Sequence, residues 1–494
     1  MTFKRFIKLS LFTILALLVA GGTFIFFWYR SGGLQQTVVQ QIGKQFLKID
    51  ENAPPENGNE PMTNAMATNF IQQFFGLEEP QTYLIMFLNN TELRPAGGFI
   101  GTYAVVTVDK ANPHVVKVEG TEIIDNLAPK NFPSEPPAPI REYLGLDRWY
   151  FRDSNWSPDF KISGAKSLEL YTKEKGVMAD EIDAVIGFTP TLIENLLRIT
   201  GPITMNGMEF TADNFTEKLE YEVEYGFAKK NVPFEQRKQM LADLAKTVII
   251  STAKSALTHW SEYKELVERM LEEKQMMVFS PKTEYQKIFE SKNWAGEMSG
   301  VNYDYLMWVD ANLGALKTDV AIDRSLNYEL YQIEDGRYVA KATMKFDHRG
   351  TFDWRTTRYR DYARVFVPAG SKLIRANGSM KTDKSSEPDT VDQGIENGRQ
   401  WFGAFISIEP GHTGELSFEY YVSPEVVNRL KANDYRLYVQ KQLGTNNVKL
   451  NLKLTFANNL AFASPGEPAG KHGDNIYENS VVLNKDVESE VRTK

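Results

Sequence analysis

A run of 20 residues without a charged side chain, from Leu9 to Trp28, constrains this chain more than any other feature. An α-helix rises about 1.5 Å per residue, so the run would be about 30 Å long, which is the thickness of the hydrocarbon core of a bilayer. Aromatic residues at positions 26–29 close its far end, and such rings favour the membrane interface. The run therefore predicts one membrane-spanning helix over residues 9–29.

The charges around this run predict its orientation. Three basic residues precede it and one follows closely: Lys4, Arg5, Lys8 and Arg30. By the positive-inside rule, residues 1–8 are a cytoplasmic tail, and the bulk of the chain is extracytoplasmic in a single-pass protein of the cell membrane. The alternative is a cleaved signal peptide with small residues at 20–22, but the apolar run continues beyond them, which favours an uncleaved anchor in the lipid bilayer.

Charge and composition exclude several classes of protein. The formal net charge is -8, which argues against a nucleic-acid partner, because nucleic-acid binders carry a basic surface. The chain has no cysteine, so disulfides, zinc–thiolate sites, iron–sulfur clusters and cysteine nucleophiles are excluded. An extracytoplasmic chain without disulfides favours a bacterial cell envelope over an animal secretory pathway.

The extracytoplasmic part divides by its patterning. Residues 30–64 form a helical stalk and a linker rich in proline and asparagine. Residues 65–320 alternate short apolar runs, such as 83–88 and 182–188, with amphipathic helical stretches. This alternation predicts an α/β domain with a layered α/β/α arrangement, in which helices cover both faces of a sheet.

The pattern changes after residue 320. Residues 321–486 contain repeated strand-like segments separated by turn signals, and a single helix is expected near 424–433. This part is therefore predicted to be a C-terminal immunoglobulin-like β-sandwich domain. The charged end, residues 487–494, is expected to be frayed.

The first candidate site is the loop that follows the predicted strand 83–88. It carries six candidate ligand-binding residues: Asn89, Asn90, Glu92, Arg94, Gly97 and Gly98. Ligands of open α/β sheets bind beyond the carboxyl ends of strands, and an arginine there can grip a phosphate with two hydrogen bonds. The alternative is a tight turn in which the glycines satisfy the backbone geometry and Arg94 pairs with Glu92.

The second candidate is the polar segment 152–159. It holds Arg152, Asp153, Asn155 and Asp159 within eight positions. Asp153 and Asp159 could hold Mg²⁺, which prefers oxygen ligands, while Arg152 and Asn155 would contact a ligand. The alternative is a network of turns and a helix N-cap ahead of a helix at residue 163.

The third candidate is a basic helix start around residues 229–238, where Lys230 and Arg237 would bind an anion at the N-terminus of a long amphipathic helix. The alternative is a solvated charged face. Five scattered histidines show no metal-binding spacing, and the chain has no Walker A loop, GxSxG motif or dinucleotide fingerprint.

Several ordered motifs resemble a known family. They are NNTELRPAGGFIGT from residue 89, RDSNWSPDF from 152, DAVIGFTPTLIENLLRITGPI from 183, DANLGALKTD from 310 and YARVFVPAGSKL from 362. Over residues 80–460 the chain resembles the uncharacterised bacterial family called domain of unknown function 4012. Its members are membrane-anchored proteins without an assigned activity, so this resemblance implies a location and no reaction.

The order of elements is more distantly similar to the LytR–CpsA–Psr phosphotransferases, which transfer glycopolymers from polyprenyl-pyrophosphate carriers to peptidoglycan. In that family a strand leads into an arginine-bearing loop, as residue 88 leads into Arg94 here. The sequence departs from the family at residues 98–102, where Gly-Phe-Ile-Gly-Thr stands in place of the Arg-Ser-Asp-Thr motif. The family's Pro-Arg-Asp motif is also not recognisable near Asp125.

Two hypotheses follow. The first is a binding or structural module of the cell envelope, whose partner is a cell-wall glycan or a protein. The second is a transferase or binder of polyprenyl-(pyro)phosphate-linked glycopolymer. In it Arg94 and Arg237 would bind the pyrophosphate, Asp153 would act with Mg²⁺, and an apolar pocket between sheet and helices would take the lipid tail.

Overall fold

The computed structural model describes residues 64–494 except 111, 132–133, 206, 228–243, 245–246, 249–250, 253–254, 256–257 and 468–472. The predicted membrane helix at 9–29 and the stalk therefore lie outside the described residues. Within the part of the chain that is described, no helix is both long enough and apolar enough to span a bilayer.

The N-terminal part is built on a five-stranded sheet with the strand order β3-β2-β1-β4-β7. Its strands are β1 (Gln81–Asn89), β2 (Phe99–Asp109), β3 (Asn112–Gly120), β4 (Ile182–Phe188) and β7 (Met276–Phe279). β1 pairs with β4 in parallel and with β2 antiparallel. Both apolar runs that predicted buried strands, 83–88 and 182–188, lie in the middle of this sheet.

Helices cover both faces of the sheet, as the layered α/β/α prediction expects. One face packs against α3 (Asn64–Phe74), α7 (Pro190–Thr200), α8 (Phe215–Tyr221), α11 (Trp260–Glu272) and α12 (Thr283–Ser291). The other packs against α4 (Thr121–Leu127), α6 (Phe160–Lys173) and the 3-10 helix η2 (Phe151–Asp153). Alternate residues of β1 serve the two cores: Tyr83 and Ile85 face the first, and Leu84 and Met86 the second. This double burial explains why residues 83–88 of β1 are all apolar.

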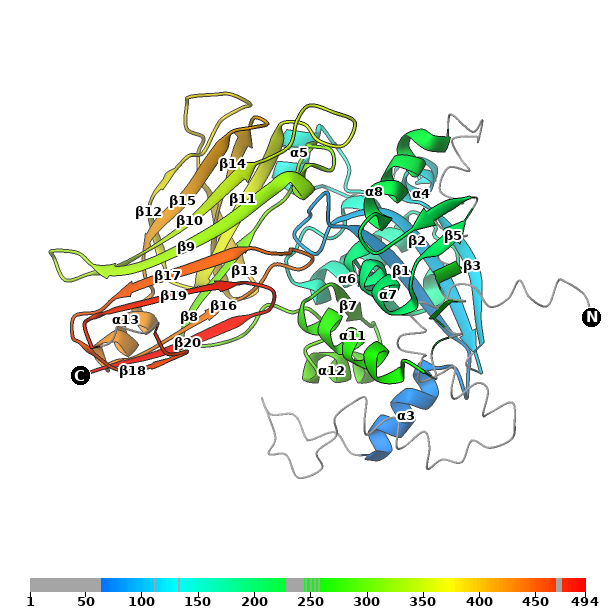
Figure 1. Cartoon of the computed structure of the whole chain (residues 1–494), viewed down its shortest axis with the longest axis horizontal. Coiled ribbons are helices and arrows are strands. Elements are labelled where there is room, and N and C mark those ends of the chain that lie inside the picture. The colour runs from blue at the N-terminus through cyan, green and yellow to red at the C-terminus, as the bar shows by residue number, and fades with distance from the viewer. Residues whose placement is uncertain are drawn as a thin grey trace, which may run out of the picture.

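The C-terminal part is a β-sandwich, which Figure 1 shows beside the α/β part. One sheet contains β12 (Lys372–Asn377), β15 (Thr413–Tyr421), β10 (Tyr338–His348), β9 (Ile322–Gln332), β17 (Lys449–Thr455) and β19 (Ile476–Val482). The other contains β13 (Asp392–Glu396), β14 (Arg399–Ile408), β11 (Tyr359–Pro368), β8 (Asp304–Val309), β16 (Asp434–Val439), β20 (Val487–Thr493) and β18 (Leu460–Ser464). Side chains from both sheets form one shared core. The expected helix is α13 (Pro424–Lys431), capped by the Ser423 hydroxyl.

Two features of the sandwich differ from the expectation. It has more strands than the seven to nine of an immunoglobulin domain, and β8, which lies before the predicted border at 320, already belongs to it. The prediction of a frayed end at 487–494 is wrong, because β20 pairs with β16 and β18. Ser489 and Val491 alternate inward along β20, a period-2 pattern that the surrounding charges obscure in the sequence.

A buried charge cluster lies where the α/β part meets the sandwich. Arg324 of β9 donates from Nε to Asp310 at 2.7 Å and from Nη2 to Asp319 and to the Tyr359 hydroxyl. Asp319 also accepts the backbone N–H of Leu93 at 2.9 Å. The cluster therefore connects the core of the sandwich directly to the loop that follows β1.

Other polar contacts join the same two regions. Gln442 donates to the carbonyl of Arg94 at 3.3 Å, and Asn90 donates to the carbonyl of Gly444 at 3.0 Å. A β-bridge pairs Ala96 with Leu443. The loop between β1 and β2 is thus fixed largely by residues of the sandwich.

Candidate functional site

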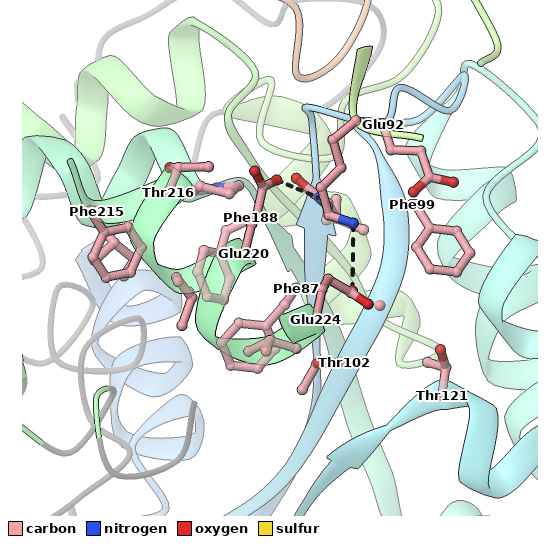
Figure 2. Close-up of a pocket in the computed structure, with 18 of the residues that line it drawn as sticks. Phe87, Glu92, Phe99, Thr102, Thr121, Phe188, Phe215, Thr216, Glu220 and Glu224 are labelled. Carbon is pink, nitrogen blue, oxygen red and sulfur yellow. Dashed lines mark hydrogen bonds and ion pairs between the residues drawn. The ribbon is translucent and has the colours of Figure 1, made fainter. Parts of the chain in front are cut away.

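A cavity of about 380 Å³ opens between the sheet and the helices of its first face. Its wall comes from the end of β1, the start of β2, the end of β4, α7, α8 and the residues beyond α8. Most of this wall is apolar, as in Phe87, Leu88, Phe188, Ile193, Phe215, Leu219, Val223, Leu244 and Val248. Figure 2 shows Phe87, Phe188 and Phe215 gathered on one side of the cavity. A space of this size and lining fits an apolar chain or ring system.

Charged side chains line another part of the cavity. Arg152 and Lys317 supply the positive charges, and their side chains are 25% and 16% exposed. Lys317 Nζ lies 3.5 Å from Oε1 of Glu224, an ion pair between the sandwich side of the site and the π-helix Glu222–Gly226 (Figure 2). π-helical turns occur often at functional sites.

The carboxylates at the cavity are held by other groups. Glu220 accepts from Asn89 Nδ2 at 3.2 Å and from Arg355 Nε at 2.7 Å. Glu92 pairs with Arg94, and burial raises the pKa of Glu92 while Arg94 and Lys317 oppose that rise. These pairings reduce the negative charge that the cavity presents to a ligand.

Two acidic side chains outside the cavity lining, Asp125 and Asp153, lie next to Arg152. Its Nη1 lies 3.1 Å from Asp125 Oδ2 and its Nε lies 3.4 Å from Asp153 Oδ2. Among the described residues, no donor makes a hydrogen bond to either oxygen of Asp125 or to Oε2 of Glu174. The carboxyl groups of Asp125 and Glu174 lie close enough to form a hydrogen bond with each other, which requires that they share a proton. Burial together with Glu174 raises the pKa of Asp125 to about 9.

This shared proton predicts a pH dependence of stability. The folded protein keeps the Asp125 proton up to about pH 9, whereas an unfolded aspartate loses it near about pH 4. Between these values the folded state binds more protons, so the free energy of unfolding falls as the pH rises. An asparagine at position 125 is uncharged at every pH. The free energy of unfolding of Asp125→Asn, relative to that of the wild type, should therefore rise by at least about 1 kcal/mol between pH 5 and pH 8.5.

Urea unfolding at the two pH values measures this gain. Asp180→Asn, which changes an exposed carboxylate on the same side of the sheet, serves as the control and should show no such gain. Equal pH profiles for wild type and Asp125→Asn would contradict the shared proton.

Arg94 lies outside the cavity lining and is 3% exposed. It donates from Nε to Asp153 at 3.3 Å, from Nη1 to the Asn312 carbonyl at 2.6 Å and from Nη2 to Glu92 at 3.2 Å. The loop therefore follows the alternative prediction, a tight turn in which Arg94 pairs with Glu92, and Asn312 of the sandwich is a further partner of Arg94. Arg94 holds the loop in place, and Glu92 is its neighbour that reaches the cavity.

The glycines of this loop have a geometric role. Gly97 and Gly98 have φ values of 109° and 149°, which side chains rarely allow. A Cβ at Gly98 would also come within 2.4 Å of the Asn89 carbonyl. Asn155 donates to the Gly98 carbonyl at 2.7 Å and is fully buried. Of the candidates in this loop, only Asn89 and Glu92 line the cavity.

Asp153 and Asp159 have separate partners. Asp153 pairs with Arg94 and Arg152. Asp159 is the N-cap of α6, accepting from the Ile162 N–H at 3.3 Å, and its other oxygen accepts from the Met298 N–H at 2.9 Å. In the described part of the chain, no group of three acidic or histidine side chains is arranged to hold a metal. Asp159 thus has the capping role that the sequence offered as the alternative to Mg²⁺ binding.

Lys230 and Arg237 lie outside the described residues, so their predicted anion site stays a prediction. Arg152 is the predicted basic residue that does reach the cavity. Lys317 and Glu224 were not predicted as site residues. Lys317 follows β1 by more than two hundred residues, and only the fold brings it to the cavity. A sequence signal for the apolar wall did exist in the amphipathic helix that became α7.

Residues 78–223 match the model of the family described as "Protein of unknown function (DUF4012)". This part contains β1, the loop after it, segment 152–159 and α8, so the expected resemblance to that family is confirmed there. A search of curated proteins gives no match to the chain. The resemblance to the LytR–CpsA–Psr phosphotransferases stays a prediction.

Solved structures resemble only parts of the chain. A putative nutrient binding protein from Legionella pneumophila is 9% identical with a TM-score of 0.23, over 38% of this chain and 71% of that protein. Yeast LTA4 hydrolase in complex with bestatin is 10% identical with a TM-score of 0.21, over 34% and 28%. An M1 zinc metallopeptidase from Deinococcus radiodurans is 12% identical with a TM-score of 0.19, over 35% and 42%. These similarities are too low to support any argument about fold or function.

Proposed function

We propose that this protein binds a lipid phosphate of the polyprenyl type, with the lipid chain in the cavity and the phosphate at Arg152 and Lys317. The observation that carries the proposal is that one cavity combines aromatic and aliphatic walls with two cationic side chains. An apolar chain gains about 25 cal/mol for each Å² that it removes from water, so such walls favour a long hydrocarbon. The predicted anchor at 9–29 would keep the protein beside the membrane that contains such lipids.

The cationic side chains favour an anionic head. Arg152 is partly exposed at the cavity and offers a planar guanidinium, which matches the geometry of a phosphate. Among the described residues, the ion pair that the Lys317 side chain forms is a long one to Glu224, which a phosphate can replace. Each charge-assisted hydrogen bond contributes about 1.5–3 kcal/mol when it is shielded from water.

The proposal is binding rather than phosphoryl transfer. Two residues that would act in a transferase, Arg94 and Asp153, do not line the cavity and are paired with each other at 3.3 Å. The side chains at the cavity therefore favour retention or presentation of a lipid phosphate over chemistry on it.

Native mass spectrometry of the full-length protein in mild detergent tests the proposal, with a polyprenyl phosphate and the corresponding polyprenol as probes. The wild type should bind the phosphate at least about tenfold more tightly than the alcohol, the equivalent of one charge-assisted hydrogen bond. Arg152→Gln and Lys317→Gln should each remove most of that preference, and Arg152→Lys should keep part of it.

Lys173→Gln is the matched control, because Lys173 is an exposed cation on α6 that pairs with Glu169 away from the cavity. It should bind both probes as the wild type does. The proposal is wrong if the wild type binds neither probe, or binds both equally.

A further inference from the structure

A group of exposed apolar side chains lies beside the charged part of the cavity. Tyr225, Leu316 and Phe352 are 44%, 45% and 63% exposed, and Trp354 is half-buried next to them. We call these four residues the apolar rim. Isolated exposed apolar residues are common on protein surfaces, so the rim is informative only because its members are brought together from three segments.

Direct contacts connect the three segments. The Tyr225 and Trp354 rings lie 5.6 Å apart, and the Tyr225 hydroxyl donates to the Trp354 carbonyl at 3.4 Å. Leu316 is joined to the loop of Trp354 through an antiparallel bridge to Thr356. The rim is therefore an ordered surface formed by the π-helix and two paired loops of the sandwich.

The rim is continuous with the cavity. Glu224 and Lys317 line the cavity, and each is the immediate sequence neighbour of a rim residue. The Lys317 N–H donates to the Arg355 carbonyl at 3.0 Å, and Arg355 in turn holds Glu220, another lining residue, at 2.7 Å. The rim and the cavity thus share their supporting residues.

Leu316 shows that the exposure is built into the backbone. It has a φ of 51°, in the left-handed region that glycine or asparagine normally occupies. A leucine in this conformation costs about 1 kcal/mol or more, yet the backbone holds it with a side chain that is 45% exposed. The surrounding backbone therefore fixes an apolar side chain at the surface next to the cavity residue Lys317.

We infer that the apolar rim is the surface by which this protein contacts the lipid bilayer when the cavity exchanges its ligand. This inference rests on the proposed function, because a lipid chain can pass from bilayer to cavity only where the two adjoin. Tyrosine and tryptophan side chains favour the membrane interface, where an aromatic body and a polar tip are both satisfied. Phenylalanine and leucine side chains can enter the acyl boundary below it. A protein partner or a glycan on the same surface is an outcome that the test separates.

The absence of cysteine in the chain allows a direct test of the contact. Phe352→Cys and, as control, Phe462→Cys each carry one environment-sensitive fluorophore in the full-length protein, reconstituted into vesicles of phosphatidylglycerol and phosphatidylethanolamine. Phe462 is 45% exposed on β18, at the end of the sandwich away from α8 (Figure 1). Brominated acyl chains should quench the label at 352 at least twofold more than the label at 462. Equal quenching at the two positions overturns the inference.

Ligand transfer supplies the second measurement. Phe352→Asp should slow the uptake of polyprenyl phosphate from vesicles about tenfold, which corresponds to the loss of roughly half the burial of one phenylalanine. Its affinity for the same lipid in detergent should stay within twofold of the wild type, because Phe352 does not line the cavity. Phe462→Asp should change neither quantity.

The outcomes separate the two proposals. If the detergent-solubilised lipid does not bind the wild type, the proposed function fails, whereas the quenching experiment still reports on the rim. If the lipid binds in detergent and Phe352→Asp takes it up from vesicles at the wild-type rate, the rim has no part in exchange and the inference is wrong. Unchanged uptake with weakened binding of a soluble oligosaccharide would identify the rim as a glycan surface instead.

Discussion

Replacement of Leu219 by tryptophan is expected to weaken lipid binding at least about 100-fold, equivalent to about 2.7 kcal/mol. Leu219 lies on α8 and its side chain lines the cavity. An indole at this position would occupy space that the apolar chain needs, so the ligand would lose contact with other apolar lining residues such as Phe87 and Phe188. Native mass spectrometry with a polyprenyl phosphate in detergent measures the loss.

The stability of this variant should change little, because the added volume extends into an open cavity of about 380 Å³ rather than into a packed core. Leu219→Met is the matched control, since it conserves volume and should retain wild-type affinity. Wild-type affinity in the tryptophan variant would show that the lipid chain does not use this cavity. A large loss of thermal stability would mean that the ring displaces α8 instead of filling the cavity.

Arg324→Met should lower the free energy of unfolding by about 3–5 kcal/mol, because it leaves buried carboxylates without their cation. The guanidinium of Arg324 is 7% exposed and pairs with Asp310 and Asp319, which are 1% and 2% exposed. Methionine preserves most of the side-chain volume, so the effect reports on charge rather than on a cavity. Urea unfolding at neutral pH measures it.

Arg349→Met is the comparison for this second variant. Arg349 forms two ion pairs, with Asp323 and Asp347, but it is 63% exposed. Exposed pairs contribute about 0–1 kcal/mol, so its loss should be small. Similar losses for the two variants would contradict the importance assigned to burial in the Arg324 cluster.

Much of the fold could be predicted from local pattern. The apolar runs at 83–88 and 182–188, the second broken only by Asp183, identified β1 and β4, because strands that are buried on both faces are mostly apolar. Proline at position 190 and glycine at 201 mark the two ends of α7. Local signals failed at β20, where glutamate and arginine alternate with the inward residues of a strand that only its pairing with β16 reveals.

The candidate site was predicted less well, for a physical reason. Arg94 has the residue type and position of an anion ligand, but the donors of its guanidinium meet Asp153 and Asn312, and Asn312 lies more than two hundred residues away. Sequence pattern cannot show which nearby groups use a side chain's hydrogen bonds. Sequence pattern also could not predict Lys317 as a site residue, because its position at the cavity depends on how the sandwich packs against the α/β part.

The way the sandwich holds the β1–β2 loop bears on how this protein can be divided. A fragment that ends at residue 320 would keep β1 and Glu92, yet it would lose Arg324, Gln442 and Gly444, which position the loop. It would also leave β8 without its neighbours β11 and β16. The two parts are therefore structurally interdependent, because the α/β half receives the shape of its β1–β2 loop from the sandwich.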